Sequence, residues 1–143
     1  MDNGILSPAE RATLEAIAER LIPSDELGPG AGRAGAPDYI ERALAGPYAG
    51  LLDAYRAGLG ALEAAGFAAL GPERQDELLA GLEGSQDADE RAFFELVRAH
   101  VLEGMFGDPD WGGNRDGAGW KLLDYPGPRR SWSEHEQQLD VRP

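Results

Sequence analysis

Residues 7–23 read SPAERATLEAIAERLIP and contain the clearest helix start in the chain. The Ser7 hydroxyl can cap the amide three residues later, Pro8 suits the first helical position, and Glu10 completes a capping box. Apolar side chains then recur at helical spacing and form one stripe, at Leu14, Ile17, Ala18, Leu21 and Ile22. Because Pro23 ends the pattern, the stretch predicts one amphipathic helix packed on a core.

The same pattern of a start signal followed by an apolar stripe recurs along the chain. It predicts a short helix over about residues 37–44, a longer one from Pro47 to Gly66, and one from Pro72 to Gly84. Another helix follows the carboxylates of residues 87–90, and its apolar side carries Phe93, Phe94, Val97, Val101, Leu102 and Met105. Residues 23–37 hold four glycines and three prolines, which predicts a long loop, either ordered or flexible.

Length and composition agree with this pattern. The chain has 143 residues, the size of one domain, and its Val, Ile and Thr residues number only eight, whereas strands are normally rich in these types. The sequence therefore predicts a single all-α domain of five or six helices. We divide it into a helical core at residues 6–106, a Gly- and Trp-rich wrapping loop at 107–130, and a polar tail at 131–143.

Charge and cysteine content exclude several classes of function. The 26 acidic and 13 basic residues leave a formal net charge of −13, which repels nucleic acid and anionic lipid headgroups. No apolar run approaches the roughly 20 residues that a membrane-spanning helix needs, so we expect no direct membrane insertion. The chain has no cysteine, which removes disulfides and thiolate chemistry. No basic stretch with an apolar block opens the sequence, so as written we expect it in the cytoplasm.

Four oxygen-bearing side chains lie within nine residues of one another, at Asp108, Asp110, Asn114 and Asp116. Such residues in a Gly-rich loop are typical of a calcium site, but the spacing lacks the ligands that an EF-hand requires. We expect them instead to cap turns.

Catalytic signatures are scarce. His100 and His135 are too few for a three-His zinc site, and His100 shares a helix face with Val97 and Val101, which is typical of a core histidine. GxSxG and HExxH motifs are absent from the sequence, and the glycines of residues 28–32 make a poor phosphate site, because no strand is expected before them and no lysine directly follows. The sequence therefore predicts no catalytic, cofactor-binding or metal-binding residue in this chain.

The segment after residue 103 is the most distinctive part of the chain. It combines glycines, which allow close backbone approach, with bulky aromatic residues, which anchor many protein interfaces. We predict a partner-binding surface made of Asp108, Pro109, Trp111, Gly112, Gly113, Asn114, Trp120, Tyr125 and Pro126. Three alternatives stay open: the segment wraps only its own domain; the chain is a self-contained helical module that closes this loop over a small ligand; or His100 and a nearby carboxylate form an acid/base pair.

A series of short motifs, taken in order, resembles one known family over about residues 6–130. The motifs are Leu6-Ser7-Pro8, Leu21-Ile22-Pro23, Gly28-Pro29-Gly30-Ala31, Phe93-Phe94-Glu95-Leu96, Glu103-Gly104-Met105-Phe106, Asp108-Pro109, Gly112-Gly113-Asn114, Gly119-Trp120 and Pro126-Gly127. In these residues the chain is similar to the gluconate 2-dehydrogenase subunit 3 family, the small subunits of membrane-bound gluconate 2-dehydrogenase.

The resemblance implies a non-catalytic partner of a flavin-dependent dehydrogenase of the glucose–methanol–choline type, which oxidises a sugar, sugar acid or glycoside. In such complexes the large subunit carries FAD and the catalytic histidine, and a separate cytochrome c subunit often accepts the electrons. The small subunit stabilises the large one, and in many members a twin-arginine signal exports both. No Arg-Arg pair precedes the helical region here, so periplasmic location would require that such a signal had been removed.

Overall fold

A computed structural model of the chain describes residues 4–127. Its regular elements are helices, and within the described part the only β-type pairing is an isolated bridge between Asp25 and Gly28. The α-helices are α1 (Pro8–Leu21), α2 (Ala36–Leu44), α3 (Leu52–Ala64), α4 (Pro72–Glu83), α5 (Ala88–Phe106) and α6 (Ala118–Leu122). Short 3-10 helices are η1 (Ala49–Leu51), η2 (Phe67–Ala69), η3 (Pro109–Trp111) and η4 (Arg115–Gly117). The predicted all-α fold of five or six helices is confirmed.

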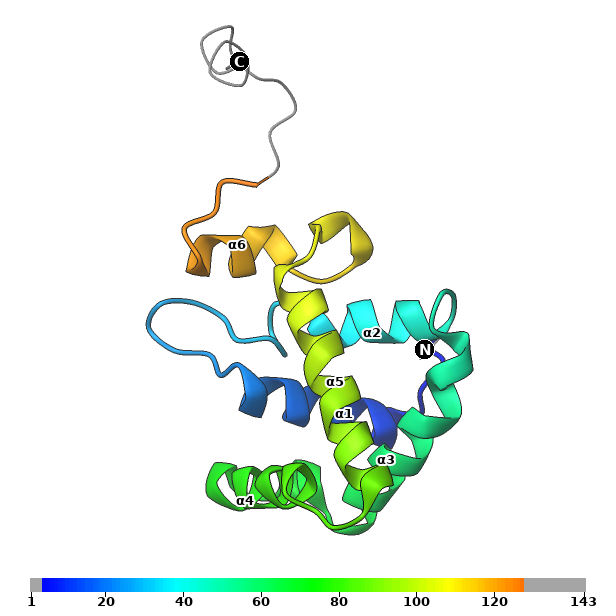
Figure 1. Ribbon diagram of the computed structural model, residues 1–143. Coiled ribbons are helices and arrows are strands. Elements are labelled where there is room, and N and C mark those ends of the chain that lie inside the picture. Colours follow the sequence, from blue (N-terminus) through cyan, green and yellow to red (C-terminus); the bar gives the residue numbers. More distant parts are fainter. Residues whose placement is uncertain (1–3, 128–143) are drawn as a thin grey trace, which may run out of the picture.

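The longest helix, α5, crosses the middle of the domain (Figure 1). Helix α4 lies beside its amino-terminal half, and α2 packs along it farther on. Helix α6 sits at the carboxyl end of α5, where the segment after residue 106 folds back (Figure 1). The functional candidates at residues 103–127 therefore share one end of the molecule with α2.

Helix α1 starts as the sequence predicts. The Ser7 hydroxyl accepts a hydrogen bond from the backbone N–H of Glu10 at 3.1 Å, and the Glu10 carboxylate accepts one from the N–H of Ser7 at 2.8 Å. Both bonds satisfy amides that a helix start leaves without partners. Leu14, Ile17 and Ala18 on the predicted stripe are buried. The capping box thus sets where α1 begins, and its stripe sets which face meets the core.

The core lies between α1, α2, α3 and α5. Its largest fully buried side chains include Tyr55, Phe67 and Met105. Burying an apolar side chain of this size contributes roughly 1.5–3 kcal/mol to folding. Because α5 supplies buried residues from Phe93 to Met105, over most of its length, the other helices pack against it.

The loop after α1 is ordered, which was one of the two predicted alternatives. Asp25 and Gly28 exchange backbone hydrogen bonds at 3.0 and 3.2 Å, and the N–H of Ala31 donates to the carbonyl of Ile22 at 2.9 Å. The loop therefore returns to the end of α1 before α2 begins.

Two features differ from the sequence prediction. The helix expected from Pro47 begins only at residue 52, because the N–H of Tyr48 donates back to the carbonyl of Ala43 at 2.7 Å and forms a turn there. In addition, the segment expected to be irregular contains α6.

None of the helices in residues 4–127 combines the length and the apolar character that a membrane span requires.

Candidate partner-binding surface

The segment after α5 turns away from the helix axis at Asp108. Its side chain accepts a hydrogen bond from the N–H of Asp110 at 2.9 Å, and Pro109 occupies the first position of η3. Gly112 ends this turn in the left-handed region, with φ of 106°. As expected, an acidic side chain here caps a turn. Within residues 4–127 no group of three or more His, Asp or Glu side chains is arranged to hold a metal ion.

Asn114 is the internal anchor of the segment. Its side chain is fully buried, its amide nitrogen donates to the carbonyl of Gly107 at 2.7 Å, and its amide oxygen accepts from the N–H of Gly119 at 2.7 Å. Asn114 itself has φ of 49°, a left-handed conformation that asparagine tolerates better than most residues. One side chain thus joins the start of the segment to the start of α6.

Two glycines let the segment lie directly on the end of α5. A β-carbon at Gly113 would collide with the carbonyl oxygen of Gly104, and one at Gly119 would collide with that of Met105. Gly113 and Gly119 are both buried. Close packing of backbone on backbone therefore requires glycine at these two positions.

Trp120 contributes to the same internal packing. Its indole nitrogen donates to the carbonyl of Phe106 at 2.8 Å, and its ring meets Tyr125 edge-on with centroids 5.5 Å apart. It is half-buried within α6. The sequence analysis assigned Trp120 to a partner surface, whereas its polar atom is used within the chain.

Trp111 behaves differently, with 56 % of its surface exposed. Beside it lies a groove of about 530 Å³ between α2, the turn after it, and the end of α5. The groove is lined by Tyr39, Arg42, Ala43, Pro47, Tyr48, Glu103 and Trp111. The guanidinium of Arg42 donates to the carbonyl of Asp110 at 3.0 Å, which ties the Trp111 turn to α2.

A carboxylate shared by two tyrosines lies in this groove. Oε2 of Glu103 accepts hydrogen bonds from the Tyr39 hydroxyl at 2.6 Å and the Tyr48 hydroxyl at 2.9 Å. Burial, followed by the bond to Glu103, raises the pKa of Tyr39. For Tyr48 the bond to Glu103 is the larger cause of a raised pKa and burial the second. Both phenols therefore stay protonated and act as donors to Glu103.

His100 lies behind the groove, in the core. Only 5 % of it is exposed, its ring stacks on Tyr48 with centroids 4.5 Å apart, and its Nδ1 hydrogen-bonds the Tyr55 hydroxyl at 2.7 Å. Burial lowers the pKa of His100, while the charge of Glu103 opposes this with a smaller effect. Because His100 bonds Tyr55 and Glu103 bonds Tyr39 and Tyr48, the geometry does not support an acid/base pair that reaches a substrate. The expected core role of His100 is confirmed.

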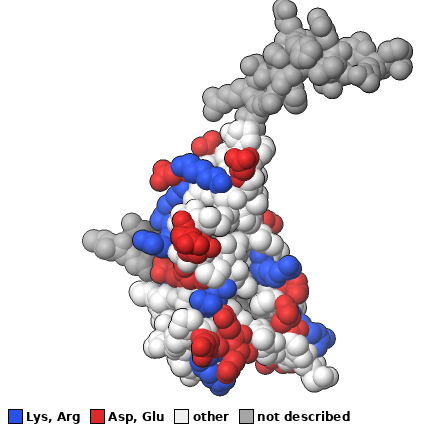
Figure 2. All heavy atoms as spheres, turned by 90° about the vertical axis from the view of Figure 1, so that its left-hand side faces the viewer, with Lys and Arg blue, Asp and Glu red and all other residues white. Residues whose placement is uncertain are grey.

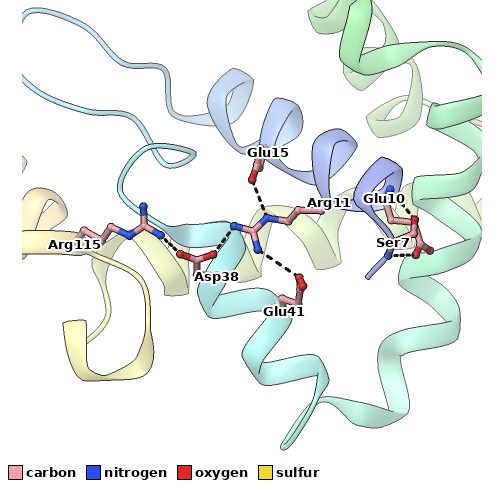
Figure 3. Close-up of polar contacts among 7 residues, drawn as sticks. All are labelled: Ser7, Glu10, Arg11, Glu15, Asp38, Glu41 and Arg115. Carbon is pink, nitrogen blue, oxygen red and sulfur yellow. Dashed lines mark hydrogen bonds and ion pairs between the residues drawn. The ribbon is translucent and has the colours of Figure 1, made fainter. Parts of the chain in front are cut away.

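A polar network fixes the segment to the rest of the domain (Figure 3). Asp38 on α2 accepts from Arg11 of α1 and from Arg115 of the C-terminal segment. Arg11 also bonds Glu15 at 2.9 Å and Glu41 at 3.4 Å. The backbone N–H of Arg115 donates to the carbonyl of Ala34 at 2.8 Å. Asp38 thus links the first helix to the segment near the end of the described chain.

Acidic and basic side chains alternate on one face of the molecule (Figure 2). The net charge of the chain is −13, yet this face shows no large patch of one sign. Ion pairs join distant elements, as between Arg20 and Asp76 at 2.8 Å. The charges on this face are therefore mixed, despite the negative net charge of the whole chain.

The nine residues predicted to form a partner surface fall into three groups. Trp111, Tyr125 and Pro126 are exposed, and Asp108, Pro109, Gly112 and Trp120 are half-buried. Gly113 and Asn114 are buried, so in this structure they support the surface from inside and cannot contact a partner. Sequence reasoning missed Tyr39, Arg42, Tyr48 and Glu103. The two tyrosines flank a helix end, but no local pattern joins them to a glutamate 55 or more positions away.

A comparison with protein families matches residues 8–127 to the family described as gluconate 2-dehydrogenase subunit 3. The chain belongs to this family. The match covers α1 through α6 and the whole groove. A search of curated proteins and a search of solved structures each gave no match.

Membership in the gluconate 2-dehydrogenase subunit 3 family confirms the resemblance noted in the motifs. The family is named for a subunit of a dehydrogenase complex, so its members work with partner chains. A subunit of a complex needs a surface that binds its partner, and the exposed Trp111 beside the groove is the strongest candidate for that surface.

Proposed function

We propose that this chain is the non-catalytic small subunit of a flavin-dependent dehydrogenase of the glucose–methanol–choline type, which oxidises a sugar or glycoside. It stabilises the large subunit and assists its maturation. The large subunit carries FAD and the catalytic residues, and a cytochrome c subunit is a candidate electron acceptor.

One observation supports this proposal beyond family membership. Trp111 is a large exposed aromatic residue, yet the turn that carries it is fixed from three sides, by Asp108, Arg42 and Asn114. An exposed aromatic residue on a rigid support loses little conformational entropy on binding, which is the property of an interface anchor. A turn that only wrapped its own helices would gain more by burying this ring.

The hydrogen bonds that the chain's own polar side chains make support a role as an accessory subunit. The side chains that could perform acid/base chemistry, His100 and Glu103, make hydrogen bonds inside the chain. Residues 30–35 read GAGRAG and match the GxGxxG pattern, but they follow helix α1 and a loop, whereas a dinucleotide-binding motif follows a strand. We therefore assign FAD to the partner chain.

Co-expression with a candidate flavoprotein, sought first in the neighbouring reading frames, tests the proposal. The expected result is a yellow complex of much larger mass, in which sugar oxidation with a dye acceptor requires the flavoprotein and this chain alone turns over nothing. Turnover by this chain free of any flavoprotein would contradict the proposal. Purification of this chain with a small molecule in the groove, and failure to bind the flavoprotein, would favour the self-contained ligand-binding module instead.

A further inference from the structure

We infer that the groove beside Trp111 receives an arginine side chain projecting from the large subunit. This inference rests on the proposed function, because it names what the partner contributes to the interface. The carboxylate of Glu103 and the aromatic rings that line the groove with it both favour one occupant, a guanidinium group.

The negative charge in the groove is fixed in position. Glu103 uses Oε2 for both tyrosine hydroxyls, and within residues 4–127 its Oε1 makes no hydrogen bond. A carboxylate held in this way has its geometry set before a ligand arrives, while one oxygen keeps its capacity to accept. A guanidinium, with donors in a planar fork, matches such an oxygen.

Three aromatic side chains line the groove together with this carboxylate, namely Trp111, Tyr39 and Tyr48. The faces of aromatic rings attract cations, and tryptophan does so best. Arginine also stacks its flat group on such rings, which lysine cannot do. Rings and carboxylate together therefore favour an arginine over a neutral side chain.

An extended proline-rich segment is the main competing occupant of an aromatic groove. Grooves of that kind rely on ring hydroxyls and indole N–H groups to bond peptide carbonyls. Here both tyrosine hydroxyls already donate to Glu103. The tyrosine hydroxyls are thus unavailable to a peptide backbone, and the groove retains a carboxylate charge that such a backbone would not neutralise.

Arg42 is the basic side chain that lines the groove, and it opposes an incoming cation. Its guanidinium donates to the Asp110 carbonyl, and the carboxylates of Asp108 and Asp110 lie on that same turn. Among the residues that line the groove, Glu103 is the acidic one and Arg42 the basic one. The Arg42 guanidinium is held on the Asp110 carbonyl, whereas Oε1 of Glu103 makes no hydrogen bond within residues 4–127, so Glu103 is the lining group that can pair with an incoming cation. The net charge of −13 also favours a cationic ligand.

The direct test uses the full chain and two small probes, N-acetyl-arginine amide and its neutral isostere N-acetyl-citrulline amide. The indole N–H signal of Trp111, assigned with Trp111→Phe, is followed by NMR. We expect a saturable shift with the arginine probe, none with the citrulline probe, and loss of the arginine response in Glu103→Gln. Equal responses to both probes, or no saturable response to arginine, would overturn the inference. An unchanged backbone spectrum for Glu103→Gln checks that the variant is folded.

A second arm uses the complex with the flavoprotein. We expect Glu103→Gln to raise the dissociation constant about tenfold or more and to weaken its salt dependence. The matched control is Glu95→Gln, an exposed position on the same helix, for which a change below about twofold is expected. If both variants weaken binding equally, the groove is not the site of recognition. If the wild-type chain binds no flavoprotein but responds to arginine, the proposed function fails while the groove chemistry stands.

Discussion

The indole nitrogen of Trp120 donates a hydrogen bond to the backbone carbonyl of Phe106 across 2.8 Å. This contact joins α6 to the last residue of α5. It separates Trp120 from Trp111, whose ring is more than half exposed, although the two residues share the same glycine-rich segment. The two tryptophans therefore should respond differently to substitution.

We expect Trp120→Ala to lower the free energy of unfolding by about 2–3 kcal/mol, because it removes a half-buried ring and a hydrogen bond. Trp111→Ala should change it by less than about 1 kcal/mol, since that ring is largely in water. Urea unfolding of the isolated chain measures both. Trp120→Phe keeps a ring but loses the N–H donor, so its loss in free energy of unfolding should lie between the losses of the two alanine variants. Equal destabilisation by the two alanine variants would show that Trp111 is also part of the fold.

Asn114 should be the most sensitive polar residue of the segment. Asn114→Ala leaves the carbonyl of Gly107 and the N–H of Gly119 without their partner, and a buried unpaired polar group costs about 1–3 kcal/mol. Asp116→Ala is the matched control, because Asp116 is also left-handed, with φ of 56°, but is exposed. Urea unfolding should show a larger loss for Asn114→Ala. A similar loss in both would assign the effect to backbone conformation alone.

His100 should make folding depend on pH. Burial lowers its pKa below the ordinary 6.5, so between the folded-state pKa and 6.5 the unfolded chain binds more protons than the folded one. Stability is therefore full above pH 6.5 and falls as the pH drops through this window. Unfolding measured at about pH 7.5 and about pH 5.5 should show a smaller difference for His100→Asn than for the wild type. An equal difference in the variant and the wild type would contradict this role for His100. The other histidine, His135, lies outside the described residues.

Asp38 should hold the C-terminal segment with modest energy. Its side chain is about one-third exposed, so the pairs with Arg11 and Arg115 are partly screened, and Asp38→Asn should cost about 1 kcal/mol or less. The more sensitive readout is hydrogen exchange at the backbone N–H of Arg115, which bonds Ala34 and should exchange faster in the variant. Glu26→Gln, an exposed loop position, is the control. If the exchange rate at Arg115 is unchanged in Asp38→Asn, Asp38 does not hold the C-terminal segment on the rest of the domain.

Local signals in the sequence were sufficient for most of the fold. The capping box of Ser7 and Glu10 formed as predicted, and most of the predicted apolar stripe of α5 is buried. Leu102 is the exception: it was predicted on the buried side, but 39 % of it is exposed, because it lies at the edge of the face that meets the core. These features depend on residues within one or two turns of each other. The start of α3 was placed too early, because the bond from Tyr48 to Ala43 competes with helix formation at Pro47.

The site was only partly predictable, because it depends on contacts between residues that are far apart in the sequence. Trp111 stood out by its residue type, but Glu103 acquires its partners through α2 packing on α5, which brings Tyr39 across 64 positions. Asn114 looked like a surface residue because its neighbours are glycines and charged residues. Its burial follows from the close approach that Gly113 and Gly119 permit, and no local pattern shows that approach.

The affinity of Trp111→Ala for the purified flavoprotein tests the central claim most directly. Leu27→Ala is the matched control, because Leu27 is 76 % exposed and lies in the loop after α1, away from the groove. Truncating an interface tryptophan commonly costs about 2 kcal/mol, so we predict a rise of about thirtyfold in the dissociation constant for Trp111→Ala. Leu27→Ala should change it by less than about twofold. An unchanged affinity for Trp111→Ala, with its fold intact, would contradict the assignment of this surface to the large subunit.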